Sequence, residues 1–277
     1  MAGRPSRPSA VRIERETAAF QLLEALRHNR RKREQRGEFL VEGVQAIDRC
    51  LAADWPVRAV LAPAGGEPSR WAEGVSRALT TAEHIDLSPP LFARLTDREE
   101  LPELLLVARI PERDLSHVPR PADGVVVLVD RPSSPGNLGT IIRTADALGA
   151  AGLVITGHGA HLYDPRTVRA SLGSLFALPV AMAPSQEALS TWLEGWRTEA
   201  PSLTVLATDE EGDLVLDRST ELSRPALVLL GSERTGLSRA LRDLADVTVA
   251  IPMAGSASSL NVAVAHGIVL HALLSLP

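Results

Sequence analysis

The chain has 277 residues, enough for one large or two ordinary domains, and its 45% of hydrophobic residues is typical of a globular protein with a packed core. Its one cysteine, Cys50, excludes an internal disulfide, and the seven histidines show no metal-ligand spacing, so we expect no metal. No apolar run is long enough to span a membrane, and residues 1–10 contain no apolar stretch typical of a secretory signal. We therefore expect a soluble, cytoplasmic protein.

The net charge of −5 is distributed unevenly along the chain. Residues 1–36 carry ten basic and four acidic side chains, a local charge of +6, which leaves −11 for the rest. A basic segment on an acidic body is typical of proteins that bind nucleic acid phosphates, although a solvated helix face would give the same pattern. The expected phosphate contacts in this segment are Arg30, Arg31, Lys32 and Arg33.

The first half of the chain alternates between helical and extended patterns. The predicted elements are a helix over residues 11–35, a strand over 38–41, a helix over 42–53, a strand over 57–61, a helix over 70–80, a strand over 83–87, a helix over 90–95 and a strand over 104–110. This alternation predicts a small α/β domain over residues 31–110, preceded by a basic arm or helix over residues 1–30 whose first ten residues are disordered. Residues 111–123 are rich in proline and charge and predict a linker.

The second half, residues 124–277, also alternates. The predicted strands are 125–129, 152–156, 203–207, 226–230 and 247–251, and the predicted helices are 137–149, 165–172, 186–197, 238–244 and 260–274. Strands that alternate with helices predict a parallel sheet, so the fold class is α/β.

Three of these strands end in loops rich in glycine, proline or serine. The loops have the sequences DRPSSPGNLGTIIRTA after residue 129, GSERTGLS after residue 230 and IPMAGSASSLNV from residue 251. In open α/β sheets, ligands bind outside the carboxyl ends of the strands, so the three loops predict one shared site. A dinucleotide site is not expected, because the first loop lacks the GxGxxG pattern that such a site needs directly after a strand.

Taken in order, the three segments resemble the three motifs of the SpoU (TrmH-like) branch of the SPOUT RNA methyltransferases. The motifs are strand-D-x-P-x-N-x-G-x-x-x-R-T-A, G-S-E-x-x-G-L-S and I-P-M-x-G-x-x-x-S-L-N-V. The approach from Asp130 to Asn137 is longer here than is common in the family. More weakly, the segment from Arg33 to Gly43 resembles the L30e-like RNA-binding domain that often accompanies this family.

The resemblance implies a C-terminal domain with a parallel sheet and a deep trefoil knot, an N-terminal L30e-like domain and a homodimer. It also implies S-adenosylmethionine as cofactor, wrapped by the three loops, with the apolar members enclosing the adenine. The implied cofactor-binding residues are Thr208, Leu230, Gly231, Ile251, Met253, Ser259 and Leu260.

The implied reaction is methyl transfer to a ribose 2′-hydroxyl of RNA. In the family, an arginine at the position of Arg143 is proposed as the base, but a guanidinium stays protonated in proteins. We therefore expect Arg143 to stabilise the developing alkoxide or to grip a phosphate. Asn137 would orient the hydroxyl or Arg143, Glu233 would hold Arg143 or an adjacent group, and Asn261 would anchor the loop.

The implied substrate is ribosomal RNA, and 23S rRNA in particular, because the N-terminal domain resembles ribosome-associated ones. The overall likeness is to actinomycete methyltransferases that confer resistance to avilamycin or thiostrepton. Arg169 follows a further family segment and is a candidate RNA contact. The alternatives are a tRNA 2′-O-methyltransferase, a catalytically silent RNA-binding protein of the same fold, and a methyltransferase of small molecules. The joint presence of the motif residues argues against the silent protein.

Overall fold

The computed structural model describes residues 10–217, 220, 222–257 and 259–274. The chain forms two compact units, one of residues 1–111 with 163–173 and the other of residues 112–162 with 174–277. The expected disorder of residues 1–9 and the basic side chains there lie outside the described residues.

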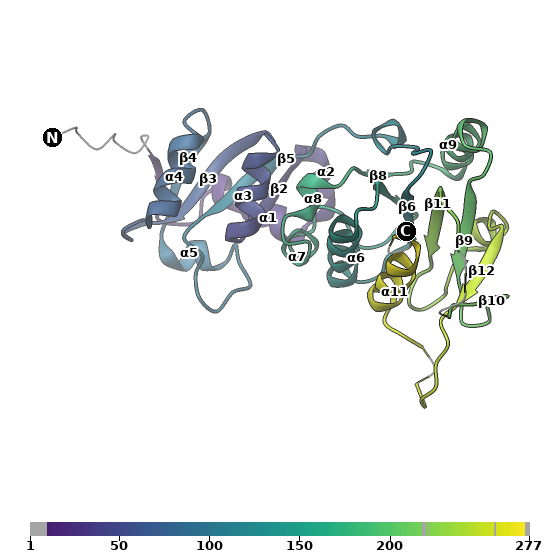
Figure 1. Cartoon of the computed structure of the whole chain (residues 1–277). Helices are drawn as coiled ribbons and strands as arrows, with labels where there is room; N and C mark the ends of the chain where they lie inside the picture. The colour runs from purple at the N-terminus through teal and green to yellow at the C-terminus, as the bar shows by residue number, and fades with distance from the viewer. Residues whose placement is uncertain (1–9, 218–219, 221, 258, 275–277) are drawn as a thin grey trace. The chain divides into compact units, whose positions relative to one another are not determined.

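The first unit is built on a mixed sheet of five strands, labelled in Figure 1. Their order is β1 (Ala10–Ile13), β4 (Glu83–Leu87), β3 (Val57–Pro63), β5 (Leu105–Arg109) and β2 (Glu38–Glu42). The first three strands run parallel, and β5 is antiparallel to both β3 and β2. The helices of this unit are α1 (Ala18–His28), α2 (Arg30–Arg36), α3 (Val44–Ala52), α4 (Arg70–Ala78), α5 (Pro89–Ala93) and α7 (Pro165–Ala170).

The segment over residues 11–35, predicted as one helix, forms a strand and two helices of the first unit. Thr17 accepts a hydrogen bond from Phe20 N and caps α1, and Asn29 accepts one from Lys32 N and starts α2. Such side-chain caps satisfy backbone donors that a helix leaves free at its start. Phe20 and Leu26 are fully buried in the core of this unit, so α1 is a packed helix.

The second unit has the predicted parallel sheet. Its seven strands follow the order β10 (Leu214–Val215), β12 (Val247–Ala250), β9 (Thr204–Thr208), β11 (Ala226–Leu230), β6 (Val125–Asp130), β7 (Gly152–Thr156) and β8 (Val180–Met182). Every pairing is parallel. Strands β8 and β10 were not predicted. They have three and two residues, which is too short for a recognisable strand pattern of hydrophobic residues.

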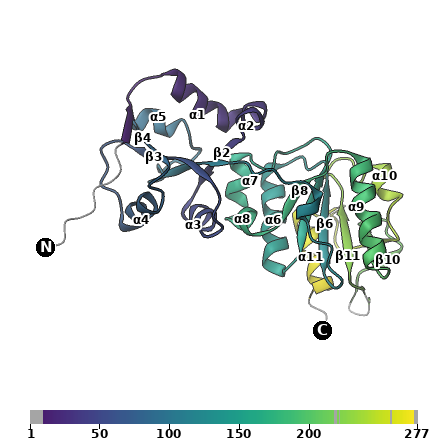
Figure 2. The ribbon, with the colours of Figure 1, turned by 90° about the horizontal axis from the view of Figure 1, so that it is seen from above.

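Helices cover both faces of this sheet, which explains why β6 and β11 are buried along their whole length. In both views, α6 (Pro135–Leu148) and α11 (Val262–Leu274) lie on one side and α9 (Gln186–Glu199) lies on the other (Figures 1 and 2). The face toward α9 holds alternate residues of the strands, such as Leu128 and Leu229, packed against Trp196. The short elements α8 (Ser174–Ala177), α10 (Arg239–Arg242) and a 3₁₀ turn (Leu115–His117) complete the unit.

The unit boundaries differ from the predicted domains in two places. Residues 163–173, predicted in the second domain, belong to the first unit, where the Tyr163 ring lies 4.7 Å from that of Phe39. The predicted linker over residues 111–123 is not a free connection, because Leu115 and Val118 are buried in the core of the second unit. In both places, apolar contacts with residues distant in the sequence decide the structure. The local sequence pattern does not show which distant residues these are.

Candidate active site

A cavity of about 740 Å³ opens at the carboxyl ends of β6, β9, β11 and β12. Because all the strands of this sheet run parallel, their carboxyl ends share one edge, and the three motif loops meet there as predicted. Nine of the predicted site residues line the cavity: Asn137, Thr208, Gly231, Glu233, Ile251, Met253, Ser259, Leu260 and Asn261.

A chain of hydrogen bonds links the polar side chains of the three loops. Asn137 Nδ2 donates to Glu233 Oε1 over 2.6 Å, and Asn261 Nδ2 donates to Asn137 Oδ1 over 3.2 Å. Ser133 donates to the other carboxylate oxygen of Glu233 through its hydroxyl and its backbone N–H. Asn137 is thus held between the second and third motif loops. Of the two alternatives that the resemblance left open for Glu233, Arg143 or an adjacent group, its hydrogen bonds go to Ser133 and Asn137.

The first and third loops are also fixed by their helices. Ser134 accepts a hydrogen bond from Asn137 N and caps α6, which sets Asn137 in the first turn of the helix. Asn261 Oδ1 accepts one from Ala263 N over 2.9 Å at the start of α11. Asn137 and Asn261 therefore both lie at the starts of helices, α6 and α11. This position of Asn261 is compatible with the expectation that it anchors its loop.

Glu233 carries a charge in this environment at neutral pH. Burial raises the pKa of its carboxyl group, but hydrogen bonds from Ser133 and Asn137 stabilise the charged form and together hold the pKa below its usual value. The cavity therefore has one anionic corner, built around a carboxylate whose two oxygens both accept hydrogen bonds.

The cavity is also lined by the apolar side chains of Ile251, Met253 and Leu260, which suit the adenosyl group of S-adenosylmethionine. Met253 and Leu260 keep 38% and 37% of their surface exposed although they line a cavity, so they offer apolar area that a ligand could cover. The close loop geometry needs Gly231, where an added Cβ would lie 2.4 Å from the carbonyl carbon of Gly236. A cavity of about 740 Å³ is large enough for a ligand of this size.

Two predicted site residues do not line the cavity. Leu230 is fully buried in the sheet, so its side chain cannot enclose an adenine, and that prediction is wrong. Arg143 is exposed on α6, and among the described residues it has no ion pair or hydrogen bond from its side chain. It follows Asn137 by six residues, which turns it by about 240° around the helix axis from Asn137.

The sequence analysis also missed residues that line the cavity. Asp209 and Glu210 follow β9, and Arg234 follows Glu233 in the second motif loop. The rule that ligands bind at strand ends could have identified the two acidic residues, because β9 lies between β12 and β11 in the sheet. Arg234 could not be identified from the motif, because the motif allows any residue at that position.

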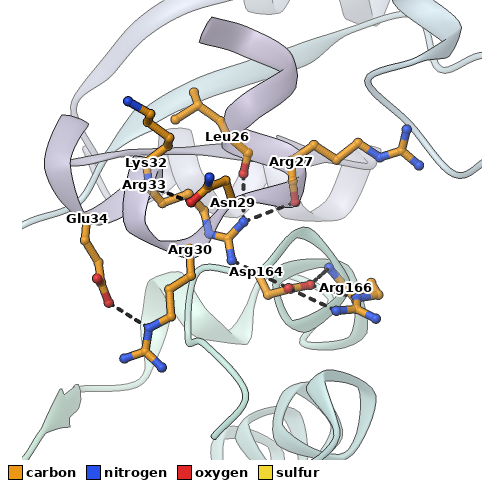
Figure 3. Close-up of polar contacts among 9 residues, drawn as sticks. All are labelled: Leu26, Arg27, Asn29, Arg30, Lys32, Arg33, Glu34, Asp164 and Arg166. Atoms are coloured by element: carbon orange, nitrogen blue, oxygen red, sulfur yellow. Dashed lines mark hydrogen bonds and ion pairs between the residues drawn. The ribbon is translucent and has the colours of Figure 1, made fainter. Parts of the chain in front are cut away.

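The four residues of α2 that were predicted to contact RNA have different environments in the structure. Arg33 is only 2% exposed, and its Nη1 donates to the carbonyl oxygens of Leu26 and Arg27 over 2.9 and 3.1 Å (Figure 3). Its Nη2 lies 3.6 Å from Asp164 Oδ2 of α7, which also holds Arg166. Burial lowers the pKa of Arg33.

Arg33 is therefore a structural cation, and the prediction that it contacts RNA is wrong. Arg30 pairs with Glu34 over 2.7 Å within the same helix. Arg31 and Lys32 are exposed, and Arg169 of α7 is half-buried. The described residues contain no group of three or more histidine, cysteine, aspartate or glutamate side chains able to hold a metal ion. Within the same part of the chain, no helix is long and apolar enough to cross a membrane.

Comparison with known proteins gives two family matches. The model of the SpoU rRNA Methylase family matches residues 124–271, and that of the SpoU L30e-like domain matches residues 17–106. The chain is 46% identical over 266 residues to the 23S rRNA (uridine(2479)-2'-O)-methyltransferase of Streptomyces viridochromogenes, which covers 95% of this chain and 92% of that protein. It is 33% identical, over 67% of each chain, to the 23S rRNA (adenosine(1067)-2'-O)-methyltransferase of Streptomyces laurentii.

Among solved structures, the fold matches the SpoU methyltransferase AviRb from Streptomyces viridochromogenes in complex with the cofactor AdoMet. The match has a TM-score of 0.88 at 44% sequence identity and covers 94% of this chain and 98% of that one. The likeness therefore extends over both units.

Proposed function

Because the chain belongs to the SpoU rRNA methylase family, we propose that it transfers a methyl group from S-adenosylmethionine to a ribose 2′-hydroxyl of 23S rRNA. The observation that carries this proposal is the Glu233–Asn137–Asn261 chain on the wall of a cavity that is also lined by the apolar side chains of Ile251, Met253 and Leu260. The names of the two Streptomyces relatives support 23S rRNA rather than tRNA as the substrate.

When bound, S-adenosylmethionine supplies a methyl group on a positively charged sulfur, which is already a good leaving group. The side chains of Ile251, Met253 and Leu260 would enclose the adenine, because they form the apolar part of the cavity. Thr208, Gly231 and Ser259 would bind its polar groups. The protein's own task is then to align the ribose hydroxyl and to stabilise the charge that develops on it.

Asn137 is the residue we assign to orienting the hydroxyl. Glu233 and Asn261 occupy one donor and the acceptor of its amide, which fixes the plane of that amide. Arg143 would stabilise the developing alkoxide or hold the neighbouring phosphate, since its guanidinium remains protonated.

A homodimer is part of the proposal, because Arg143 does not line the cavity of its own chain. Helix α11 packs against α6 and exposes 53% of Val264 and 38% of Ile268, an apolar stripe on one face of the helix. A second copy on this stripe would lie beside the helix that carries Arg143. We also propose that the C-terminal segment threads the trefoil knot typical of the family, and that the protein acts in the cytoplasm.

For RNA binding we propose Arg31 and Lys32 of α2 together with Arg30 and Arg169. The first two are exposed, which supports contact with phosphates. Deleting residues 1–35 would not test this, because the deletion removes Phe20 and Leu26 from the core. Charge reversal of Arg31 and Lys32 keeps the core intact and is expected to weaken RNA binding and its dependence on salt.

The reaction is tested by following the transfer of label from tritiated S-adenosylmethionine to total rRNA and, separately, to total tRNA, with nucleoside analysis. We expect a labelled 2′-O-methylnucleoside in 23S rRNA. Asn137→Ala should abolish the label, and Thr140→Ala is the matched control, because Thr140 is exposed on the same helix outside the cavity.

Label only in tRNA would overturn the substrate and keep the chemistry. No label in either RNA, together with tight RNA binding, would identify the silent RNA-binding protein instead. If methylation of 23S rRNA is found, the proposed link to resistance is tested by expressing the protein in a sensitive strain and measuring the inhibitory concentrations of avilamycin and thiostrepton. Unchanged concentrations for both drugs would contradict that link.

A further inference from the structure

Arg131 adopts a backbone conformation that side chains other than glycine rarely adopt. It directly follows β6 and has a φ of +48°, in the left-handed region. A strained residue of this kind persists only where its surroundings determine its conformation, and such residues cluster at functional sites. The contacts around Arg131 show what holds it there.

The guanidinium of Arg131 joins two of the motif loops. Its Nε and Nη2 donate to Asp130 Oδ2 over 3.1 and 3.0 Å, and Nη2 also donates to the carbonyl oxygen of Gly236 over 3.0 Å. The same carboxylate of Asp130 accepts hydrogen bonds from Ser238 N and Thr156 Oγ1. Asp130 is 2% exposed, so this is a buried carboxylate shared by the loops after β6, β7 and β11.

The loop after β7 leaves room for this arrangement. An added Cβ at Gly157 would lie 2.5 Å from Arg131 Cγ, and one at Gly159 would lie 2.2 Å from Pro132 O. Side chains at these two positions would displace the turn, so the two glycines allow Arg131 to fold back onto Asp130.

The carbonyl that Arg131 binds belongs to the hairpin that carries Glu233. Ser232 and Gly236 exchange backbone hydrogen bonds of 3.1 and 2.9 Å, which closes a loop with Glu233 at its tip. Glu233 reaches the first motif loop through Ser133 and Asn137. The hairpin is therefore attached to that loop at both ends, by Arg131 at its base and by Glu233 at its tip.

We propose that Arg131 is a positioning residue that holds this hairpin, residues 232–236, against the first motif loop and so keeps Glu233 on Asn137. The inference rests on the proposed function for its effect on catalysis, but its structural part does not depend on that function. Arg131 does not line the cavity, so it acts through Glu233 and not on the substrate.

The test uses Arg131→Gly in the full-length protein, because glycine adopts the left-handed conformation without strain and any effect comes from the missing guanidinium. Asp54→Gly is the matched control, since Asp54 also has a positive φ, of 52°, but is exposed in the first unit. Arg131→Lys, which keeps a charge beside Asp130, serves as a second variant if the glycine variant folds poorly.

Two measurements are made on each variant. We expect the amides of residues 232–238 to exchange hydrogen at least about tenfold faster in Arg131→Gly, with the rest of the second unit unchanged. We also expect the single-turnover rate of transfer to 23S rRNA to fall at least about tenfold. Added ethylguanidinium should partly restore the slow hydrogen exchange and the transfer rate in Arg131→Gly. It should restore neither in Asn137→Ala.

Unchanged exchange at residues 232–238 would overturn the inference, as would faster exchange spread over the whole second unit, which would indicate a general loss of stability. An altered hairpin with an unchanged transfer rate would overturn the link to Glu233. A wild-type protein that transfers no methyl group would count against the proposed function, while the exchange result would still decide the role of Arg131 in holding the hairpin.

Discussion

The carboxylate of Glu233 connects the first and second motif loops on the wall of the cavity. Its two oxygens accept hydrogen bonds from Ser133 and Asn137, so its charge fixes the orientation of an amide that the substrate would meet. Hydrogen bonds to a charged group are stronger than those between neutral groups, so the carboxylate contributes rigidity as well as charge.

At the residue scale we predict that Arg143→Ala lowers the methyl-transfer rate by about a hundredfold or more, as expected when a donor to a developing oxyanion is removed. Cofactor binding, measured by calorimetry, should remain nearly intact, because Arg143 does not line the cavity. Arg239→Ala is the control, since the Arg239 side chain is 95% exposed on α10. A parallel loss of cofactor affinity would show that the role assigned to Arg143 is wrong.

At the scale of elements, α2 and α7 are joined by a buried charge. Arg33 and Asp164 expose 3% and 13% of their side chains, and Arg33 also satisfies two carbonyl oxygens near the end of α1. Removing Arg33 takes the donor from the carbonyl oxygens of Leu26 and Arg27, whereas Asp164 keeps its ion pair with Arg166.

We predict that Arg33→Met destabilises the first unit by about 1 to 3 kcal/mol, the usual cost of leaving buried polar groups without hydrogen bonds. Loss of hydrogen-exchange protection in α1, α2 and α7 measures this effect. Arg31→Met is the control and should change stability by less than about 0.5 kcal/mol, because Arg31 is exposed on the same helix. If Arg33→Met left protection unchanged and weakened RNA binding instead, Arg33 would be an RNA contact after all.

The buried face of α11 contains a titratable side chain, His266. His266 is fully buried, and burial lowers its pKa from 6.5 to about 4, so it is neutral in the folded protein at neutral pH. The unfolded chain binds this proton more readily, so stability falls as the pH drops from 6.5 toward 4.

We predict that this one group lowers the free energy of unfolding by about 3 kcal/mol at most across that range. His266→Gln should flatten the pH dependence of thermal unfolding of the second unit. His271→Gln on the same helix is the control and should keep the pH dependence. An unaltered slope in His266→Gln would show that other groups cause the acid sensitivity.

At the scale of the whole molecule, the proposed homodimer would complete the site, because Arg143 does not line the cavity of its own chain. We predict that Val264→Glu, which places a charge on the exposed stripe of α11, converts a dimer to a monomer in sedimentation analysis and lowers methyl transfer at least about tenfold. Val215→Glu is the control, because Val215 is 51% exposed on β10. A monomeric wild-type protein with full activity would contradict the homodimer.

The sequence by itself determined the α/β class, the parallel sheet and the meeting of three loops, because strand periodicity, apolar runs and turn residues are local properties. The resemblance of its three motifs to the SpoU family also identified nine residues that line the cavity. The sequence could not show that the Leu230 side chain is fully buried, or which group near Arg143 Glu233 binds.

Only the tertiary structure decided which side chains are buried and with which distant partner. The sequence of α2 does not show whether Arg33 is exposed to solvent or contacts Asp164, because Asp164 lies far away in the chain. Likewise, Arg131 occupies an open position of the motif, and its role depends on the carbonyl of Gly236, which follows β11, the neighbour of β6 in the sheet. Such contacts arise when the sheet brings distant loops together, and no local pattern encodes them.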